Sequence, residues 1–411
     1  MLDTNGIRQL AYVVTIDDIT PIEGYDRVEL AHVSGWTIVV GKGEFHKGDP
    51  AIYFEIDSKL PEVKPFTNME FLAKKKYKVK TQRMCKCISQ GLLMSAANFG
   101  WEILVGPIEK GKIEVIVDDK GDSHSPNDES RFLTKQLGVT YNEPEDNARK
   151  AASADKYKKM AQRNGKLFSK QPFRWLMKRP WGRKLLFMFF GKKKDKRGWP
   201  AWVVKTDEER IENLTHLFKD KSEWIATEKI DGTSTTFSVK RGHGFKKNEF
   251  FVCSRNVVFD KPDKKCFYET NVYTEMYIKY NIEQVLTEML EKYPEAEWIT
   301  IQGETFGANI QRRDYHMKDH DFRAFNLIMS HTGRWNTEKM AKELNLYNVP
   351  SVPIICTHFV LPDTLEELRS FVNSKPSAID NDIKEGIVFR SLDGSRSFKC
   401  VSPEFLIKYH Q

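Results

Sequence analysis

One lysine in the C-terminal half of the sequence stands where a substrate could reach it. Lys229 lies in residues 224–239, where apolar and polar residues alternate on both sides of Asp231-Gly232. This alternation predicts two strands, and Asp-Gly is a typical turn between strands. Because successive side chains of a strand alternate faces, Lys229 and Asp231 would share one face if the strand continues to the turn. The amine could act as a nucleophile, but a solvated lysine beside an ordinary hairpin turn fits the same pattern.

Two glutamates further along the chain could hold a divalent metal ion. Ile299 and Ile301 alternate with polar residues, which places Glu304 on the polar face at the end of a predicted strand. Glu385 precedes the run Gly386-Ile-Val-Phe in the same way, and Gly386 would allow a ligand to approach closely. Carboxylate oxygens of this kind suit Mg²⁺ or Mn²⁺. Taken singly, each glutamate is more often a surface residue at a strand end.

The lysine motif is followed by five further motifs in a fixed order. They are Ser254-Arg255-Asn256, Gly303-Glu304-Thr-Phe-Gly307, Asp321-Phe322-Arg323-Ala-Phe325-Asn326-Leu, Glu385-Gly386-Ile-Val-Phe-Arg390 and Ser397-Phe398-Lys399. Together with Lys229-x-Asp-Gly, this set resembles the covalent nucleotidyltransferase superfamily of ATP-dependent DNA and RNA ligases and mRNA-capping guanylyltransferases. A chance match to the whole ordered set is much rarer than a match to one motif.

The resemblance implies a role for the first motifs in binding ATP. Lys229 would carry AMP as a phosphoramidate, and its neighbours Glu228 and Ile230 would belong to the nucleotide site. Arg255 and Glu304 would hold the ribose.

The later motifs are assigned in the same way. Phe325 would stack on adenine, although Phe322 is close enough in the sequence to contest the assignment. Asn326 stands where the superfamily commonly has aspartate. Glu385 would bind the metal ion, and Lys399 would contact the α-phosphate as a second catalytic lysine. Many relatives have Lys-x-Lys at this last motif, whereas this chain has Lys-Cys-Val, so only one lysine is assigned.

Attack of Lys229 on phosphorus requires the neutral amine. The ordinary lysine pKa near 10.4 leaves roughly one lysine in a few thousand uncharged at pH 7, a penalty of about 4–5 kcal/mol. Glu228 and Asp231 would increase this penalty, because a negative charge favours the ammonium form. We therefore expect Lys399, Arg255 and a carboxylate-bound metal ion to lie close enough to lower the pKa of the amine.

The order of the domains distinguishes groups within the superfamily. DNA ligases and capping enzymes carry an OB domain after the last lysine motif, but only residues 400–411 follow Lys399. Short β-branched and aromatic runs lie near the N-terminus instead, and they predict a small barrel of the OB type. This order resembles that of the Deinococcus- and Naegleria-type RNA ligases, as do residues 205–214 and 397–406.

The predicted fold class is α+β, in three parts. Residues 1–105 would form an OB-like β-barrel that binds nucleic acid. Residues 106–200 would be a linker with a charged helix and a basic, aromatic insertion. Residues 201–411 would form the nucleotidyltransferase (adenylation) domain, in which antiparallel sheets have flanking helices.

Capping signals and periodicity predict several helices. Thr206 could cap one, with Glu209 closing the capping box. Lys205 and Arg210, at its start, could hold the leaving phosphates or an RNA 5′-phosphate, or could simply form a helix-start ion pair. Further helices are predicted at residues 131–137, 143–164, 282–293 and 361–373.

Two basic stretches could contact a polyanion. Residues 74–83 predict a basic strand with Tyr77 in it, which suits a groove along a phosphate backbone. An edge strand that lysines protect against aggregation fits equally well. Residues 173–197 combine basic and aromatic side chains and could dock on nucleic acid, on a membrane surface or on a partner. They could also be a linker whose apolar residues tuck against a domain; residues 142–200 look like an insertion.

The composition excludes some classes of protein. The 411 residues carry 65 Lys and Arg against 57 Asp and Glu, and this modest excess, +8, suits a polyanionic partner. The six cysteines form no CxxC pair, so a disulfide framework is not indicated. The sequence shows no secretion signal, and no apolar run approaches the ~20 residues needed to span a bilayer. We expect a monomer in a reducing compartment, cytoplasmic or nuclear.

The implied activity is that of an ATP-dependent RNA ligase. Lys229 would attack the α-phosphorus of ATP and expel pyrophosphate, AMP would pass to a 5′-phosphate end, and a 3′-hydroxyl would displace AMP. The expected partner is RNA with 3′-hydroxyl and 5′-phosphate ends, at nicks in RNA or RNA–DNA duplexes, with Mg²⁺ or Mn²⁺ as cofactor. The alternatives are a DNA ligase, a capping-type nucleotidyltransferase, or a non-catalytic nucleic-acid-binding protein that keeps the fold.

Overall fold

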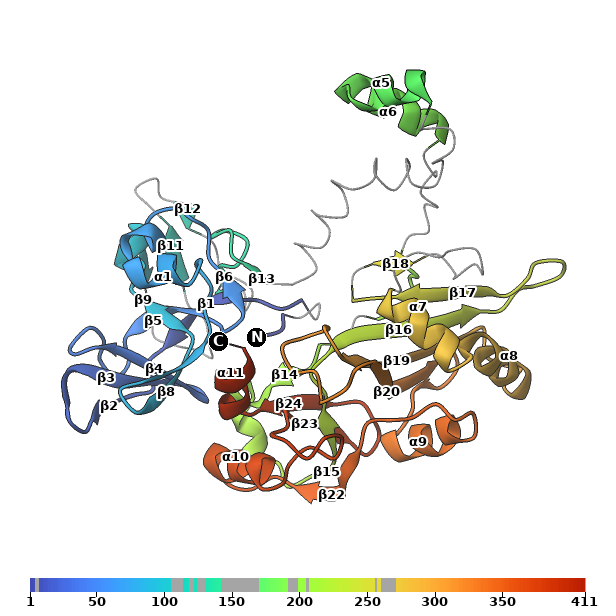
Figure 1. The fold of residues 1–411 in the computed structure, drawn as a ribbon. Helices are drawn as coiled ribbons and strands as arrows, with labels where there is room; N and C mark the ends of the chain where they lie inside the picture. The colour runs from blue at the N-terminus through green and yellow to red at the C-terminus, as the bar shows by residue number, and fades with distance from the viewer. Residues whose placement is uncertain are drawn as a thin grey trace. The chain divides into compact units, whose positions relative to one another are not determined.

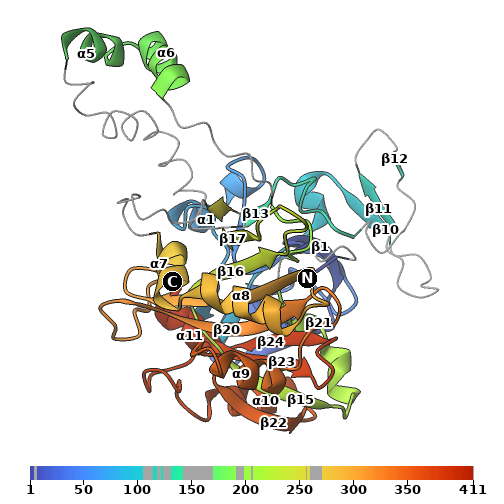
Figure 2. The same cartoon turned by 90° about the vertical axis from the view of Figure 1, so that its right-hand side faces the viewer.

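Contacts divide the computed structural model into two units, which Figures 1 and 2 show from two sides. One unit comprises Met1–Thr140 and Trp199–Gln411, and the other comprises Tyr141–Gly198. The residues that the structure describes are 1–3, 7–104, 114–117, 122–123, 131–141, 170–190, 199–204, 207–255, 257–259 and 271–410.

Short strands dominate the N-terminal part of the chain, as the sequence predicts. They pair as β1-β5-β9, β2-β3-β4, β7-β8, β10-β11-β12 and β13-β6. In β4, buried Trp36, Ile38 and Val40 alternate with more exposed residues, as in a strand with one face in a core. The strands are β1 (Ala11–Thr15), β2 (Asp18–Ile22), β3 (Tyr25–Val33), β4 (Trp36–Gly41), β5 (Pro50–Phe54), β6 (Ser58–Lys59), β7 (Thr81–Met84), β8 (Cys87–Gln90), β9 (Leu92–Met94), β10 (Glu102–Leu104), β11 (Glu114–Val117), β12 (Asp122–Ser123) and β13 (Thr140–Tyr141).

Aromatic residues fill the core of this part. The rings of Tyr12 and Tyr53 meet edge to face at 5.5 Å between centroids, and Trp36 lies beside them. Phe405 and Leu406 of α11 (Pro403–Tyr409) belong to the same core. The C-terminal helix therefore joins the N-terminal strands to the rest of the chain through apolar burial.

Two predictions for the N-terminal part are wrong. Residues 74–83 do not form one basic strand, because Lys76 and Tyr77 have positive φ angles of 53° and 58°, which strands exclude. Helix α1 (Glu70–Lys74) precedes this turn, and only Thr81–Met84 is a strand. Residues 131–137 form turns rather than a helix, and Phe132 makes an antiparallel bridge with Tyr12.

The C-terminal part contains two sheets. The order in the first is β14-β24-β23-β15-β22, and in the second it is β18-β17-β16-β19-β20-β21. All pairings are antiparallel except that of β14 with β24. The strands are β14 (Glu209–Arg210), β15 (Glu223–Lys229), β16 (Thr233–Lys240), β17 (Glu249–Cys253), β18 (Val258–Phe259), β19 (Trp298–Gly307), β20 (His320–Met329), β21 (Gly333–Arg334), β22 (Ile354–Val360), β23 (Gly386–Ser391) and β24 (Ser397–Val401).

Helices pack on both sheets. Val285, Leu286 and Met289 of α8 (Ile282–Lys292) share a core with the six-stranded sheet, and α8 confirms the predicted helix. Helix α10 (Leu365–Asn373) packs on the five-stranded sheet and begins after a capping box at Thr364, inside the predicted range. The others here are α7 (Val272–Lys279) and α9 (Thr337–Asn345).

The stretch around Lys229 forms two strands, but not a hairpin. β15 pairs with β22 and β23, whereas β16 pairs with β17 and β19. Asp231-Gly232 therefore crosses from one sheet to the other. A Cβ on Gly232 would lie 2.3 Å from the carbonyl oxygen of Thr305, so only glycine allows this close approach.

The helix predicted from Thr206 is also wrong. Thr206 lies outside the described residues, and Glu209 and Arg210 form β14, parallel to β24. Two short 3₁₀ helices follow, η3 (Ile211–Asn213) and η4 (Thr215–Lys219). Pairing with β24 thus outweighs the local helix signal.

The second unit contains a pair of helices, α5 (Gln171–Met177) and α6 (Pro180–Phe190). The predicted helix at residues 143–164 lies outside the described residues. None of the helices within the described ranges has both the length and the apolar character needed to span a bilayer.

Candidate active site

Lys229 is the last residue of β15 and lies close to β23 and its neighbour β24. It pairs with Gly386 of β23, so the preceding residue, Glu385, lies beside it. Lys229 Nζ is 2.7 Å from Glu385 Oε1. A Cβ on Gly386 would come within 2.3 Å of the Cys400 carbonyl oxygen, so glycine is needed where β23 meets β24.

Glu304 and Asp231 complete a group of carboxylates around the amine. Glu304 lies opposite Ser234 in the β16–β19 pairing, inside β19 and not at a strand end as predicted. Asp231 follows β15, and its carboxylate is 3.4 Å from Nε2 of His410. Both acidic residues act on Lys229 electrostatically, as does Glu385. The structure therefore brings the predicted lysine and the two predicted glutamates together.

The pKa of Lys229 differs from the expectation. Burial alone would lower the pKa, but the charges of Glu385, Glu304 and Asp231 outweigh burial, and the pKa is raised. The predicted lowering by Lys399 and Arg255 is thus not found in the protein alone. The charges of the protein alone therefore favour the protonated amine.

Burial and mutual repulsion both act on the carboxylates around Lys229. Burial raises the pKa of Glu304 to about 8, and the charges of Glu385 and Asp231 act in the same direction. Glu385 Oε2 and Asp231 Oδ2 are buried without a hydrogen-bond partner. Hard oxygen donors in this condition fit a divalent cation such as Mg²⁺ or Mn²⁺. However, no three His, Cys, Asp or Glu side chains among the described residues are already arranged around one metal position.

Asp207 forms ion pairs with three positively charged side chains. Its carboxylate is 3.0 Å from Lys399 Nζ, 3.0 Å from an Arg255 guanidinium nitrogen and 2.8 Å from Arg8 Nε. Burial would raise the pKa of Asp207, but these three cations outweigh it and hold the pKa well below its usual range. Three cations on one carboxylate form a site that could exchange this anion for a phosphate.

The two phenylalanines that competed for adenine have different surroundings. Phe322 is fully buried in the core and contacts Phe237 at 5.2 Å between ring centroids. Phe325 is half-buried and packs against a cluster that contains Ile230 and Val352. Strand alternation along β20 explains the difference, because the two side chains are three residues apart and face opposite sides. Of the two, only Phe325 is accessible.

Two residues in or beside the motifs, Glu228 and Asn326, have structural partners. Glu228 is buried, and its carboxylate accepts hydrogen bonds from the Ser377 hydroxyl and, at 2.8 Å, from the Ala378 amide. Asn326 is buried and donates to the side chain of Gln302 at 3.0 Å.

Of the two predicted phosphate ligands, the structure describes only Arg210. Lys205 lies outside the described residues. Arg210 is buried, and its guanidinium lies 3.2 Å from Asp57 and 3.9 Å from Glu55. It therefore joins the N-terminal part of the chain to β14, and it precedes η3 as the N-cap residue of this short 3₁₀ helix.

Sequence reasoning missed Asp207, Arg8 and His410. Asp207 lies within the stretch that resembles RNA ligases, which was its only signal. Arg8 stands far from the motifs in the sequence, and His410 follows the last motif without belonging to it. The fold of the chain ends brings both to the site.

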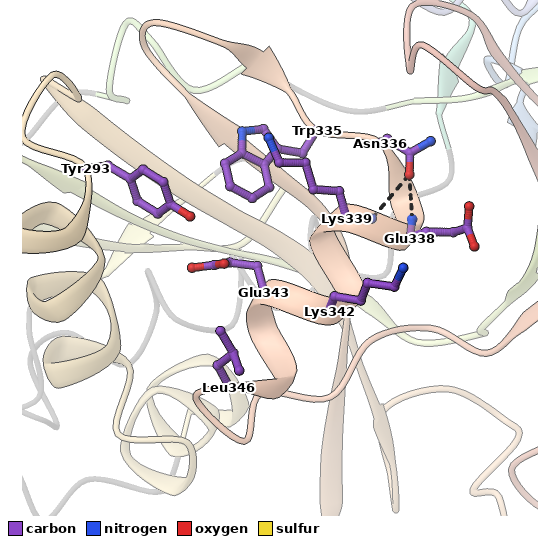
Figure 3. Close-up of a pocket in the computed structure, with 8 residues that line it drawn as sticks. All are labelled: Tyr293, Trp335, Asn336, Glu338, Lys339, Lys342, Glu343 and Leu346. Atoms are coloured by element: carbon purple, nitrogen blue, oxygen red, sulfur yellow. Dashed lines mark hydrogen bonds between the residues drawn. The ribbon is translucent and has the colours of Figure 1, made fainter.

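A separate cavity of about 480 Å³ lies beside α9. Figure 3 shows Trp335 and the side chains of α9 around it, with the Asn336 side chain accepting hydrogen bonds from the amides of Glu338 and Lys339. None of the predicted site residues lines this cavity. Its lining is Tyr293, Trp335, Asn336, Glu338, Lys339, Lys342, Glu343 and Leu346.

Known proteins share this organisation. Residues 222–410 match the RNA ligase family, and residues 10–96 match an OB-fold domain family. Solved structures of Naegleria gruberi RNA ligase are similar over nearly the whole chain. The complex with PPi has a TM-score of 0.67 and 24% identity, covering 97% of this chain and 98% of that chain.

Two complexes of variants of that ligase are equally similar. The one with ATP and Mn has a TM-score of 0.69 and 24% identity, covering 98% of this chain and 100% of that chain. The one with AMP and Mn has a TM-score of 0.67 and 25% identity, covering 98% and 99%. No curated protein sequence matches the chain. The predicted α+β architecture, an OB fold followed by a ligase fold, is confirmed.

Proposed function

We propose that this protein, whose residues 222–410 match the RNA ligase family, is an ATP-dependent RNA ligase that joins 3′-hydroxyl and 5′-phosphate ends. The observation that carries the proposal is the contact between Lys229 and Glu385 at 2.7 Å, with the charges of Glu304 and Asp231 acting on the same amine. Lys399, which pairs with Asp207, also interacts electrostatically with Lys229. This arrangement places a nucleophile between groups that can bind a metal ion and groups that can bind phosphate.

The first step is transfer of AMP to the protein. The Lys229 nitrogen forms a bond to the α-phosphorus of ATP, and the bond to pyrophosphate breaks. Lys399 and Arg255 would release Asp207 and bind phosphate or ribose instead. Positioning and charge neutralisation supply most of the rate enhancement in such a reaction.

Glu385 and Glu304 would hold Mg²⁺ or Mn²⁺. When bound, the ion neutralises phosphate charge and opposes the carboxylates that keep the amine protonated. Glu385 Oε2 is buried and unpaired in the structure, which is the condition that a cation would relieve.

The base of ATP would lie against Phe325 and Ile230. These side chains lie in one apolar cluster, and Phe325 is its accessible aromatic ring. Arg255 and Glu304 would hold the ribose. The carboxylate of Glu228 is already engaged, so we assign Glu228 to supporting the site rather than to contacting the nucleotide through its side chain.

The second and third steps use RNA. AMP passes from Lys229 to the 5′-phosphate, and the 3′-hydroxyl then attacks this phosphate and releases AMP. We propose that residues 1–105 bind the nucleic acid and that residues 201–411 carry out the chemistry. Lys205 is a candidate for phosphate binding, whereas the pairing of Arg210 with Asp57 favours a structural role.

We further propose that the protein acts as a monomer in a reducing compartment. The cysteines within the described residues carry free thiols, which agrees with such a compartment.

The decisive experiment follows the adenylyl group. The protein is incubated with α-³²P-labelled ATP and Mg²⁺ or Mn²⁺, and we expect labelled protein from the native chain but not from Lys229→Ala. Addition of a nicked duplex with a 5′-phosphate should move the label to the nucleic acid. A chain that binds no label, or a Lys229→Ala variant that binds it equally well, would contradict the proposal.

The substrate is tested on matched nicks. The strands carry either RNA or DNA at the 3′-hydroxyl side, and we expect sealing to require RNA there. Equal sealing of an all-DNA nick would support a DNA ligase instead.

A further inference from the structure

The helix pair α5–α6 exposes a ridge of large apolar side chains. Trp181, Leu185 and Phe189 follow at spacings of four residues, which places them on one face of α6. They are 52%, 41% and 69% exposed, and Met188 beside them is 71% exposed. Trp175 of α5, 49% exposed, meets Trp181 edge to face at 6.0 Å between ring centroids. This ridge is unusual, because large apolar side chains rarely gather on a solvent-facing surface.

The ridge is not the inner face of the helix pair. A separate set of apolar side chains packs around Leu186, which is 3% exposed. That set is Phe173, Leu176, Met177, Phe187 and Phe190. The two helices therefore have a small core of their own and a second apolar surface that the core does not use.

Positive charge surrounds the ridge. The sequence has no acidic residue between Asp155 and Asp195, but it has many lysines and arginines there. Lys178 and Arg179, which connect α5 to α6, and Lys184 of α6 are exposed. A basic surface with an apolar ridge complements a surface that carries anionic groups over an apolar layer.

We propose that the α5–α6 ridge binds the surface of a bilayer that contains anionic phospholipids. The ridge side chains would enter the boundary between headgroups and acyl chains, and the basic side chains would meet the lipid phosphates. The attraction of each basic residue to the anionic surface and the burial of the apolar side chains would act together. The helices would lie on the membrane, since neither spans one.

Single-stranded RNA fits the ridge less well. RNA binding of this type needs aromatic faces on which bases stack. The Arg179 guanidinium lies 3.7 Å from the centre of the Trp175 ring and covers one of its faces, and Trp181 packs against the same tryptophan. Leu185 and Met188 offer no aromatic face. The exposed side chains suit an acyl layer better than nucleobases.

The test is flotation of the full-length protein with lipid vesicles. We expect it to float with vesicles of phosphatidylcholine and phosphatidylserine, and much less with phosphatidylcholine alone. Leu185→Ser combined with Phe189→Ser should weaken binding by about tenfold or more, because each side chain loses its apolar burial. Lys178→Glu combined with Lys184→Glu should weaken binding to the anionic vesicles to a similar extent.

The matched control removes exposed apolar side chains elsewhere. Phe245 and Ile278 are 109% and 66% exposed on the other unit, and changing both to serine should leave flotation unchanged. Labelling with ATP should be the same for all these variants, which separates this inference from the proposed ligase activity. The inference is overturned if the native protein does not float with anionic vesicles, or if Leu185→Ser with Phe189→Ser floats as well as the native protein. It is likewise overturned if that double variant loses affinity for single-stranded RNA and not for vesicles.

Discussion

Lys229 Nζ and Glu385 Oε1 lie 2.7 Å apart, so the expected nucleophile is held as an ion pair before any nucleotide binds. The contact raises the pKa of the lysine together with the charges of Glu304 and Asp231. The ion pair therefore favours the protonated amine, which cannot attack phosphorus. A cation bound to the carboxylates would favour the neutral amine instead.

Removing the charge of Glu385 should stop the first chemical step. We expect Glu385→Gln to slow labelling by ATP by about 10²–10³-fold, because the variant loses a metal ligand and the group that positions the amine. The rate of protein adenylation at saturating ATP measures the effect. Glu366→Gln, an exposed position on α10, is the control and should behave as the native protein. A Glu385→Gln variant with a native rate would remove Glu385 from the mechanism.

Asp207 should matter first for stability. Asp207→Asn leaves Lys399, Arg255 and Arg8 without their shared anion, so we expect the free energy of unfolding to fall by about 3 kcal/mol. Urea unfolding measures this loss. Pyrophosphate should stabilise the variant more than the native protein, because the anion then replaces the missing carboxylate. Equal stabilisation of both proteins would show that these cations do not bind phosphate.

The sequence predicts which residues belong to the site better than it predicts which strands pair with one another. The alternation of residues around Lys229 and Glu304 identifies strands, because burial on one face imposes a period of two. It does not identify the partner strands. β15 and β16 are adjacent in the chain and belong to different sheets, since β15 pairs with β23 and β16 pairs with β19, both more than fifty residues away.

Charge at the site depends on the same long-range pairing. The number of carboxylates around Lys229 follows from β15 lying beside β23, and from Gly232 packing on β19. A count of nearby residues in the sequence cannot supply this. The predicted lowering of the lysine pKa included a carboxylate-bound metal ion, whereas the charges of the protein alone raise this pKa. The helix predicted at Thr206 was wrong, because the pairing of β14 with β24 outweighs local capping.

The two phenylalanines of β20 should respond in opposite ways. Phe325→Ala should weaken ATP binding by about tenfold with little change in stability, because its ring is half-buried and would stack on the base. Phe322→Ala should instead lower the free energy of unfolding by about 3–5 kcal/mol, because it empties a fully buried position. Titration with ATP and urea unfolding of both variants distinguish the roles. An exchange of the two effects would assign adenine to Phe322.

The charge of Lys399 should limit ATP binding at alkaline pH. Burial lowers the pKa of Lys399 to about 8, and Arg8 acts in the same direction. The side chain is therefore charged below pH 8 and becomes neutral above it, so the dissociation constant for ATP should rise as the pH increases beyond 8. For stability the sign is opposite. The folded pKa lies below the ordinary value of 10.5, so this group penalises folding at low pH, and the penalty disappears as the pH rises from 8 to 10.5.

Lys399→Arg separates these effects, because arginine stays charged throughout this range. We expect its ATP dissociation constant to be nearly independent of pH from 7 to 10, whereas that of the native protein increases. Binding is measured with Lys229→Ala in both backgrounds, so that covalent labelling does not interfere. If both proteins lose affinity equally above pH 8, a group other than Lys399 controls binding, and its role as the phosphate contact must be reassigned.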